Sequence, residues 1–378
     1  MTYNGGSDFD VEYGRVESTS TKLKYPIGDW SSIYNSKIKK GYKDVSHTVS
    51  VKVDDKKSAS PTQYAKIAER LVDDFMSTMK RYTDGLVAKT YSVQAKDVTQ
   101  AQVDEAQDYI DDLLALSKAK KLDEKKVNQL LLDLYTVIPR YMSKVQYNLL
   151  PHITLGSSLQ QEQDNLDAMS SQVALLDTKS KKDKKVQKQV QTLLDTIGIS
   201  MKETKSNKDL EYLTKQIGNT GRKITGIFEV NKPEEDKEFT AWLAKQKDKT
   251  TKFLIHGTRC TSVIPILEQG LKIRPSGNFQ FSGKAYGDGN YYSEVVQKSL
   301  GYTGYDNDKV LLVYEVHTGN PFVYDGWYRG NSFTLNYAEL SKRGYDSTHV
   351  KAGNGLLNSE IIAYKEQQDR IRYIIWLK

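Results

Sequence analysis

The chain has only one cysteine, Cys260, among its 378 residues. A single thiol excludes an internal disulfide and a cysteine-based zinc site, and we expect it to be a small buried residue. The sequence also lacks an apolar run long enough to cross a bilayer, and its first residues do not form a secretory signal. We therefore expect a soluble, intracellular protein that does not contact a membrane.

The composition is that of an ordinary globular protein. A length of 378 residues suggests two or three domains, and 38% hydrophobic residues are enough to form their cores. The formal charge of +7 permits contact with nucleic acid without requiring it. No cluster of His, Cys, Asp and Glu has the spacing of metal ligands, so we expect no metal.

One segment combines an apolar run with polar residues at its end. Residues 253–259 read Phe-Leu-Ile-His-Gly-Thr-Arg, which predicts a buried strand that delivers His256 to the floor of a cleft. Because Gly257 has no Cβ, a planar ligand is expected to lie directly against its backbone N–H and C=O. Two later segments belong with it, residues 287–294 (Gly-Asp-Gly-Asn-Tyr-Tyr-Ser-Glu) and 357–360 (Leu-Asn-Ser-Glu).

Together these segments resemble the catalytic domain of the poly(ADP-ribose) polymerase family. His256, Tyr291 and Glu360 stand where that family keeps its His-Tyr-Glu triad, and Lys298-Ser299 and Tyr302 follow in the expected order. The resemblance implies a catalytic domain over residues 205–378, with a mixed α+β fold and a split, mostly antiparallel sheet. It also implies NAD as the substrate that donates ADP-ribose.

The resemblance assigns a role to each matching residue on the nicotinamide side. The Gly257 backbone and the Ser299 hydroxyl would grip the carboxamide, Tyr302 would stack on the ring, and Tyr291 would line its other side. Glu360 would bond the 2′-hydroxyl of the nicotinamide ribose, favour positive charge at the neighbouring carbon and polarise the acceptor.

The adenosine side has its own set of matching residues. His256 would bond the hydroxyl of the adenosine ribose and orient the donor. Three further residues match positions that touch the adenosine half, namely Thr258, Ser262 and Lys272.

The N-terminal residues 1–59 predict a small β-rich domain. Phe9, Val11 and Tyr13 alternate with acidic residues at the period of a strand. Tyr13-Gly-Arg15 and the later Lys-Gly-Tyr resemble the WGR domain of DNA-dependent family members, with tyrosine in place of tryptophan and a first strand that is short. The resemblance implies DNA with strand breaks or ends as a partner, contacted by Tyr13, Arg15, Lys37, Lys39, Lys40 and Lys43.

Residues 60–204 carry helical periodicity and no catalytic constellation. Ser60-Pro61 predicts a helix start, Asp123 a helix cap, and Pro139 a helix stop. Amphipathic stretches follow at 109–116, 127–138, 159–176 and 186–197. This resembles the all-α helical regulatory domain of the family, which obstructs the donor site until DNA is bound. The fold class predicted for the whole chain is therefore α+β multidomain.

The sequence favours a DNA-stimulated poly(ADP-ribose) polymerase that modifies protein acceptors, including itself. One alternative is a mono-ADP-ribosyltransferase acting on proteins or nucleic-acid ends. Another is a DNA-end-binding protein whose transferase part is a relic. Sizing of the product separates the first two, and nicotinamide release by the wild type and by Glu360→Gln tests the third.

Overall fold

A computed structural model describes residues 2–3, 8–13, 21–26, 29, 32–33, 36, 61–117, 122–142, 148–149, 155–181, 193–204, 210–274, 285–324, 337–353 and 356–378. Its contacts divide the chain into two compact units, Met1–Ala59 and Ser60–Lys378. None of the helices in these ranges combines the length and the apolar character that a bilayer crossing requires.

The first unit contains a three-stranded antiparallel sheet in the order β1-β2-β3. Its strands are β1 (Thr2–Tyr3), β2 (Asp8–Tyr13) and β3 (Thr21–Pro26), and β2 confirms the strand predicted from the alternation of residues 8–13. Of the residues predicted to touch DNA, Tyr13 is described only by its backbone in β2. The others lie outside the described residues: Arg15, Lys37, Lys39, Lys40 and Lys43.

The second unit begins with helices whose ends follow local sequence signals. They are α2 (Pro61–Thr90), η3 (Ala95–Asp97), α3 (Gln100–Leu116), α4 (Glu124–Val137), α5 (Leu155–Lys181) and α6 (Leu193–Ile197). Pro61 is the first residue of α2, as predicted. Thr99 forms a capping box with Gln102 at the start of α3, and the predicted cap Asp123 accepts the Lys126 N–H of α4.

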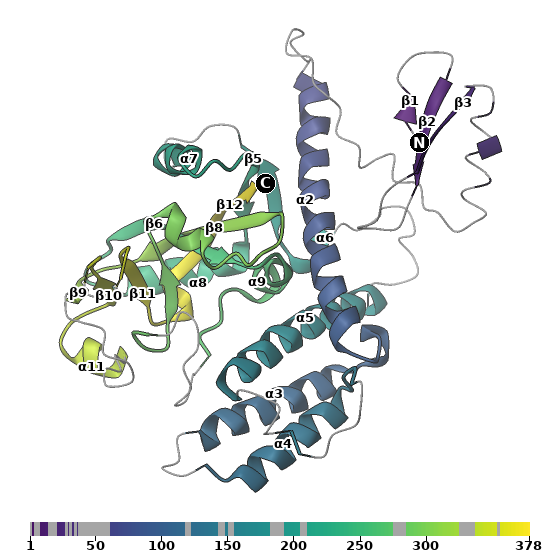
Figure 1. Cartoon of the computed structure of the whole chain (residues 1–378). Helices are drawn as coiled ribbons and strands as arrows, with labels where there is room; N and C mark the ends of the chain where they lie inside the picture. Colours follow the sequence, from purple (N-terminus) through teal and green to yellow (C-terminus); the bar gives the residue numbers. More distant parts are fainter. Residues whose placement is uncertain are drawn as a thin grey trace. The chain divides into compact units, whose positions relative to one another are not determined.

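Helix α2 belongs to two hydrophobic cores. Its C-terminal part contributes Val87 to the core of the helical bundle with α3, α4 and α5. Its middle part contributes Phe75 to the core beneath the large sheet, where the ring lies 4.9 Å from Phe228 and 5.6 Å from Trp376. Figure 1 shows α2 as the long helix that runs from the bundle past the sheet.

Two sheets form the rest of this unit. The larger has the order β4-β5-β12-β8-β6 and is antiparallel throughout. Its strands are β4 (Ser200–Glu203), β5 (Ile224–Asn231), β6 (Thr251–Thr258), β8 (Lys309–His317) and β12 (Asp369–Leu377). The interior strand β8 is buried along almost its whole length, in keeping with the apolar run over residues 310–314.

The smaller sheet has the order β7-β11-β10-β9. Its strands are β7 (Asn290–Tyr292), β9 (Pro321–Tyr324), β10 (Ser347–Val350) and β11 (Glu360–Ala363), and only the pair β9/β10 is parallel. A backbone bridge between Ile255 of β6 and Ser293, just after β7, joins the two sheets. The described residues thus form a mixed α+β structure with mostly antiparallel sheets.

Short helices cover these sheets. They are α7 (Glu211–Gly218), α8 (Pro233–Ala244), η6 (Cys260–Ser262), α9 (Val263–Gln269), α10 (Val296–Leu300), α11 (Tyr337–Lys342) and η8 (Glu366–Gln368). Gly270 ends α9 with φ of 80°, as its position predicts. The single thiol, on Cys260, is fully buried, also as predicted.

Candidate active site

A cavity of about 770 Å³ opens in the second unit between the end of β6, strand β7, helices α9 and α10, and helix α5. Its volume lies within the range of roughly 300–1,000 Å³ that is usual for small-molecule sites. His256 of β6, Tyr291 of β7 and Glu360 of β11 all line it. The three residues that the sequence analysis grouped therefore meet in one place, although more than 100 positions separate the first from the last.

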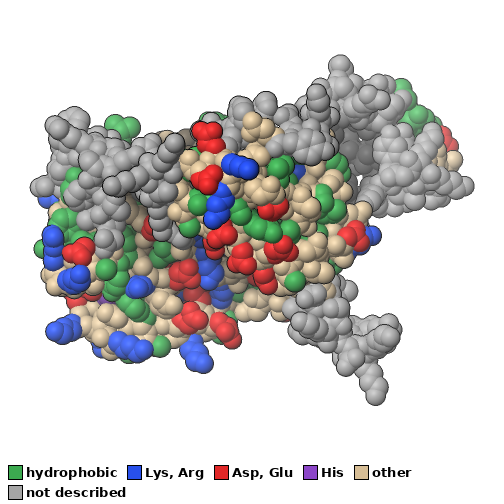
Figure 2. Space-filling view, turned by 90° about the horizontal axis from the view of Figure 1, so that it is seen from below, with side chains coloured by type: hydrophobic (Ala, Val, Ile, Leu, Met, Phe, Trp, Pro, Cys, Tyr) green, Lys and Arg blue, Asp and Glu red, His purple; other side chains and the backbone are tan. Residues whose placement is uncertain are grey.

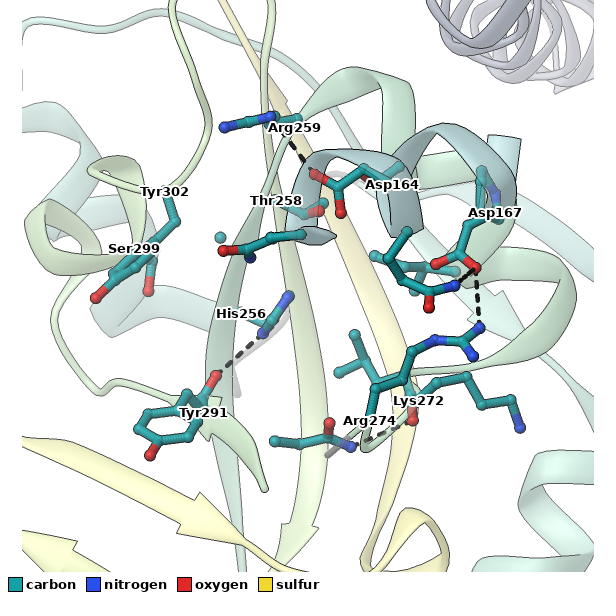
Figure 3. A pocket seen from close by; sticks show the side chains of 18 of the residues that line it. Asp164, Asp167, His256, Thr258, Arg259, Lys272, Arg274, Tyr291, Ser299 and Tyr302 are labelled. Carbon is teal, nitrogen blue, oxygen red and sulfur yellow. Dashed lines mark hydrogen bonds and ion pairs between the residues drawn. The ribbon is translucent and has the colours of Figure 1, made fainter. Parts of the chain in front are cut away.

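The His256 ring is held in one orientation and one tautomer. Its Nδ1 lies 3.0 Å from the carbonyl oxygen of Tyr291, so this nitrogen must carry the proton and donate it (Figure 3). Burial lowers the pKa of His256 below its ordinary value, which keeps the ring neutral. The Nε2 atom is then an acceptor, suited to a hydroxyl group of a ligand.

The Tyr291 side chain is fixed at its hydroxyl end. The hydroxyl donates to the Gly287 carbonyl at 2.8 Å and accepts the Tyr286 N–H at 2.7 Å. Burial raises the pKa of Tyr291 well above its ordinary value, so the phenol stays protonated. The ring, rather than the hydroxyl, is the part offered to the cavity.

Glu360 is the first residue of β11 and is 5% exposed. Its Oε1 lies 2.7 Å from the Nζ atom of Lys298 on α10, and both side chains are largely buried. Burial, followed by the negative charge of Glu360, raises the pKa of Tyr302. The site therefore holds a buried carboxylate whose charge is matched by one ammonium group.

The backbone around Gly257 is arranged for a ligand that needs both a donor and an acceptor. In edge strand β6 the N–H and C=O of Ile255 point away from β8 and bond Ser293. By the two-residue alternation of strands, the N–H and C=O of Gly257 point the same way. A Cβ on Gly257 would lie 1.8 Å from the Ser299 carbonyl oxygen, so the missing side chain makes room for Ser299 and not for a ligand, which corrects the predicted reason.

The other predicted binding residues surround this point. The Ser299 hydroxyl is buried and donates to the Ile255 carbonyl at 3.3 Å, whereas Tyr302 is 41% exposed. Thr258 and Ser262 line the cavity on the side of α9. Lys272 also lines it, but its Nζ atom lies 3.0 Å from Glu366 of η8. All predicted residues of the dinucleotide site thus line one cavity.

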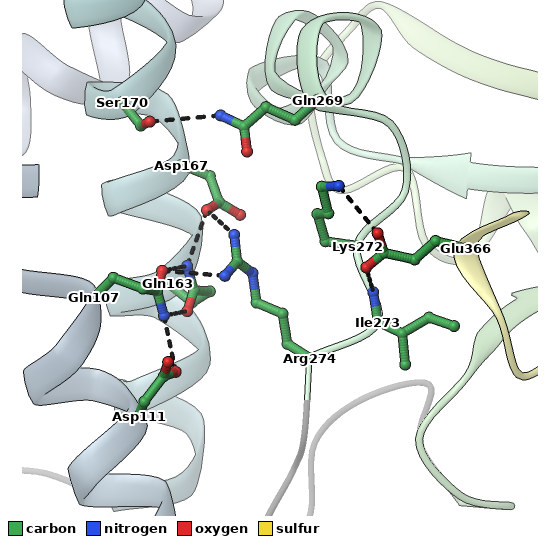
Figure 4. A network of polar contacts seen from close by, with 10 residues as sticks. All are labelled: Gln107, Asp111, Gln163, Asp167, Ser170, Gln269, Lys272, Ile273, Arg274 and Glu366. Carbon is green, nitrogen blue, oxygen red and sulfur yellow. Dashed lines mark hydrogen bonds and ion pairs between the residues drawn. The ribbon is translucent and has the colours of Figure 1, made fainter. Parts of the chain in front are cut away.

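Helix α5 contributes two carboxylates to the opposite wall. Asp164 lies 3.5 Å from Arg259, and Asp167 lies 2.9 Å from Arg274. Burial raises the pKa of Asp164 to about 6, and that of Asp167 is also raised. Figure 4 shows the neighbouring contacts, in which Gln269 of α9 donates to Ser170 of α5 and Arg274 reaches Gln107 of α3.

Sequence reasoning did not identify these acidic residues or the role of Lys298. The signal for the carboxylates was weak, because Asp164 and Asp167 are spaced i and i+3 on a helix that carries many other polar residues. Among the residues that the structure describes, no group of three or more His, Cys, Asp and Glu is placed to hold a metal ion.

Comparison with known proteins decides the family. Residues 203–325 match the family profile described as the poly(ADP-ribose) polymerase catalytic domain. The chain is also 54% identical over 177 residues to the poly(ADP-ribose) polymerase-like protein 100L of Invertebrate iridescent virus 6, covering 97% of that protein and 47% of this chain. This chain belongs to the poly(ADP-ribose) polymerase family. It is an NAD⁺ ADP-ribosyltransferase, and NAD is its substrate.

Three other relatives are similar to parts of this chain. It is 41% identical over 173 residues to the uncharacterized protein 101L of the same virus, covering 70% of that protein and 46% of this chain. It is 28% identical over 181–184 residues to poly(ADP-ribose) polymerases 1 of Gallus gallus and 2 of Arabidopsis thaliana. These alignments cover 41% of this chain and only 17% and 28% of those two proteins.

Proposed function

We propose that this family member transfers ADP-ribose from NAD to protein acceptors, including itself, releases nicotinamide and extends the product into chains. The observation that carries the proposal is the meeting of His256, Tyr291 and Glu360 at one cavity that Gly257 also lines. The proposal also divides the chain into a WGR-like domain (1–59), a helical regulatory domain (60–204) and a catalytic domain (205–378).

The nicotinamide end is assigned to the pocket beside β6. The Gly257 N–H and C=O and the Ser299 hydroxyl bind the carboxamide, because an amide offers both a donor and an acceptor. The rings of Tyr291 and Tyr302 enclose the nicotinamide plane. Such directional contacts hold the leaving group while the glycosidic bond breaks.

The adenosine end is assigned to the side of α9. The unprotonated Nε2 of His256 accepts a ribose hydroxyl and so fixes the donor along the cavity. Thr258, Ser262 and Lys272 contact the adenosine half.

Glu360 is proposed as the residue that acts on the chemical step. When the bond to nicotinamide breaks, the sugar carbon develops positive charge, as in glycoside hydrolysis. The Glu360 carboxylate bonds the neighbouring 2′-hydroxyl, stabilises that charge and polarises the incoming nucleophile. The Lys298 ammonium lies 2.7 Å from the buried carboxylate and pairs with its charge.

Incorporation of labelled NAD, read on a gel, tests the reaction and its product. We expect the protein to become labelled in a ladder of increasing size and free nicotinamide to accumulate in step with the label. Single ADP-ribose units at saturating NAD and DNA would contradict chain extension while preserving the transferase. The absence of both label and nicotinamide, with DNA present, would contradict the proposed reaction.

Helix α5 is proposed to restrain the donor site. Arg259 and Arg274 are the cations at the cavity that are suited to a pyrophosphate, and both are engaged by carboxylates of α5. A dinucleotide must compete with Asp164 and Asp167 for these side chains. This placement supports the regulatory role that the helical region has by resemblance.

Neutralising the two carboxylates should therefore raise basal activity. We expect Asp164→Asn with Asp167→Asn to lower the KM for NAD about two- to fivefold without DNA, because partly exposed pairs contribute about 1 kcal/mol or less. Wild-type KM should approach the variant's value as the pH falls through about 6, where Asp164 becomes protonated. Steady-state kinetics over a pH series measures both effects.

A matched control is Asp133→Asn on α4, where the carboxylate accepts a hydrogen bond from Gln129 of its own helix and, among the described residues, from no other helix. Its kinetics should equal those of the wild type. An unchanged or higher KM in the double variant would contradict the restraint.

DNA with strand breaks is proposed as the activator, through the N-terminal unit with Tyr13, Arg15 and the lysines 37, 39, 40 and 43. On the face shown in Figure 2, both acidic and basic side chains of the described residues are present. NAD turnover should rise with nicked DNA and lose this stimulation with rising salt, linearly in log salt. Arg15→Ala should reduce the stimulation, and no stimulation of the wild type at low salt would contradict the proposal.

A further inference from the structure

A buried carboxyl group lies behind the candidate active site. Asp369, the first residue of β12, is 2% exposed, and its Oδ2 accepts two hydrogen bonds from β7. The Asn290 amide donates at 3.0 Å and the Tyr292 hydroxyl donates at 2.6 Å. All three side chains are buried. A carboxyl group of the larger sheet thus holds the edge strand of the smaller sheet.

The two donors stand on either side of Tyr291. Because side chains alternate along a strand, Asn290 and Tyr292 point to one face of β7 and Tyr291 points to the other. The Tyr292 ring also contacts the His256 ring edge-on, with 6.1 Å between centroids. The His256 Nδ1 in turn donates to the Tyr291 carbonyl. The bonds from Asp369 to β7 therefore affect the positions of Tyr291 and His256, which both line the donor cavity.

Few other polar contacts among the described residues hold β7 to the larger sheet. The described backbone link between β7 and the larger sheet is the bridge from Ser293 to Ile255, beyond the end of the strand. Asn290 adds a longer bond, 3.4 Å, to the Leu271 carbonyl, just before the cavity-lining Lys272. Without the Asp369 carboxyl, β7 would be held to the larger sheet by this bridge, by the His256–Tyr291 hydrogen bond and by the packing of the Tyr292 ring on His256 and Tyr314. The polar side chains on its buried face would lose their acceptor.

A contribution to folding stability does not explain why a carboxyl group is buried at position 369. Apolar side chains of similar size would fill the same space with no cost of burying a carboxyl group. Hydrogen bonds, unlike apolar contacts, fix a strand at a defined height and rotation. Short bonds to an ionised oxygen are the strongest of this kind.

We propose that Asp369 is a positioning residue for the reaction, which holds β7 through Asn290 and Tyr292 so that Tyr291 and His256 face the bound dinucleotide in register. The inference rests on the roles proposed above for Tyr291 and His256. It predicts that changes at Asp369, remote from the substrate, alter the KM for NAD as well as kcat.

We expect the ionised form of Asp369 to hold β7 in place more firmly than the protonated form. Burial, with the acidic neighbours Glu235 on α8 and Glu366 in η8, raises the pKa of Asp369 to about 7, although Tyr292 and Asn290 lower it. Tyr314 of β8 is a further titratable group beside it. As the pH rises through about 7, the carboxyl ionises and its bonds to β7 strengthen. Stability changes in the opposite direction, because a raised folded-state pKa stabilises the protein below it and this contribution is lost above it.

The test compares four variants of the full chain: Asp369→Asn, Asp369→Ala, Tyr292→Phe and, as the control, Tyr314→Phe. Asparagine keeps an oxygen that accepts both bonds but cannot ionise, and phenylalanine at 292 keeps the ring against His256 but removes one donor. The Tyr314 hydroxyl is buried against the same region and has no hydrogen-bond partner among the described residues.

Relative to Asp369→Asn at the same pH, kcat/KM of the wild type should rise about fivefold between about pH 6 and about pH 8, from the stronger bonds to an ionised acceptor. Taking this ratio removes the effect of Asp164, which titrates in both proteins. Tyr292→Phe should lose about tenfold and Asp369→Ala about 100-fold, with part of each loss in KM. Tyr314→Phe should match the wild type.

A purely structural role predicts a different pattern. Partial unfolding would lower kcat per protein with KM and the pH profile unchanged, and the melting temperature would fall in proportion. If the wild type turns over NAD but Asp369→Asn and Tyr292→Phe keep its KM and its pH profile, the inference is wrong, even where Asp369→Ala fails to fold. A wild type without turnover would instead contradict the proposed function itself.

Discussion

Glu360→Gln should lower kcat for nicotinamide release about 100- to 1,000-fold and leave the KM for NAD within about twofold. Glutamine has the same shape and still accepts the Lys298 ammonium that lies 2.7 Å from Oε1, so the fold and the donor cavity should persist. What is lost is the negative charge opposite the developing oxocarbenium ion. A group that acts mainly in the transition state changes kcat far more than KM.

The measurement is nicotinamide release in single and multiple turnovers, with the melting temperature as the test of folding. Glu229→Gln is the matched control, because Glu229 forms a surface pair with Lys202 on the outer part of the larger sheet. Its kinetics should be those of the wild type. Equal turnover by Glu360→Gln and the wild type would remove Glu360 from the chemical step, and equal low rates in both would support the relic interpretation.

Gly257→Ala should abolish measurable turnover and destabilise the protein by about 3 kcal/mol. The added Cβ would lie 1.8 Å from the Ser299 carbonyl oxygen and 2.6 Å from its carbonyl carbon. Because those atoms are backbone, α10 must move away from β6, and it takes with it the Ser299 hydroxyl and Lys298. Both sides of the proposed carboxamide pocket are then displaced.

Gly85→Ala serves as the control, and we expect it to stabilise the protein where Gly257→Ala destabilises it. Gly85 lies on the exposed side of α2, and a Cβ there would meet no atom within 4 Å. Alanine in a helix interior stabilises relative to glycine by up to about 1 kcal/mol. Urea unfolding and NAD turnover measure both variants. Near-normal turnover by Gly257→Ala would mean that the pocket tolerates a shift of α10, contrary to the proposed use of Ser299.

The segments that the sequence identified correctly are those with local rules. Asp123 caps α4 and Gly270 ends α9, because a cap needs only its own turn. The alternation of residues 8–13 indicated β2 with its bounds, and the apolar run at the start of residues 253–259 indicated β6, which begins two residues earlier, at Thr251. Helix α5 extends further than its predicted stretch of 159–176, since polar ends carry little periodicity.

Contacts between distant segments were not predictable in the same way. Nothing beside Lys298 in the sequence indicates that its side chain turns toward Glu360, 62 positions later. Asp369 reads as the polar start of an apolar strand, and only the packing of two sheets shows that Asn290 and Tyr292 meet it. Long-range polar pairs depend on tertiary geometry, which a single sequence does not encode in any local pattern.

Because α2 contributes to two hydrophobic cores, the helical bundle and the sheets cannot be separated into independent fragments without exposing one of these cores. A fragment beginning at β4 would lack Phe75, which packs on Phe228 and Trp376. It would therefore expose an apolar surface on one face of the larger sheet, and we expect such a fragment to aggregate. Heat should therefore melt the bundle and the sheets in a single cooperative step. In the proposed activation, the carboxylates of α5 separate from Arg259 and Arg274. Because α2 belongs to both cores, we expect this separation to be a local shift of α5 and not a detachment of the whole helical bundle.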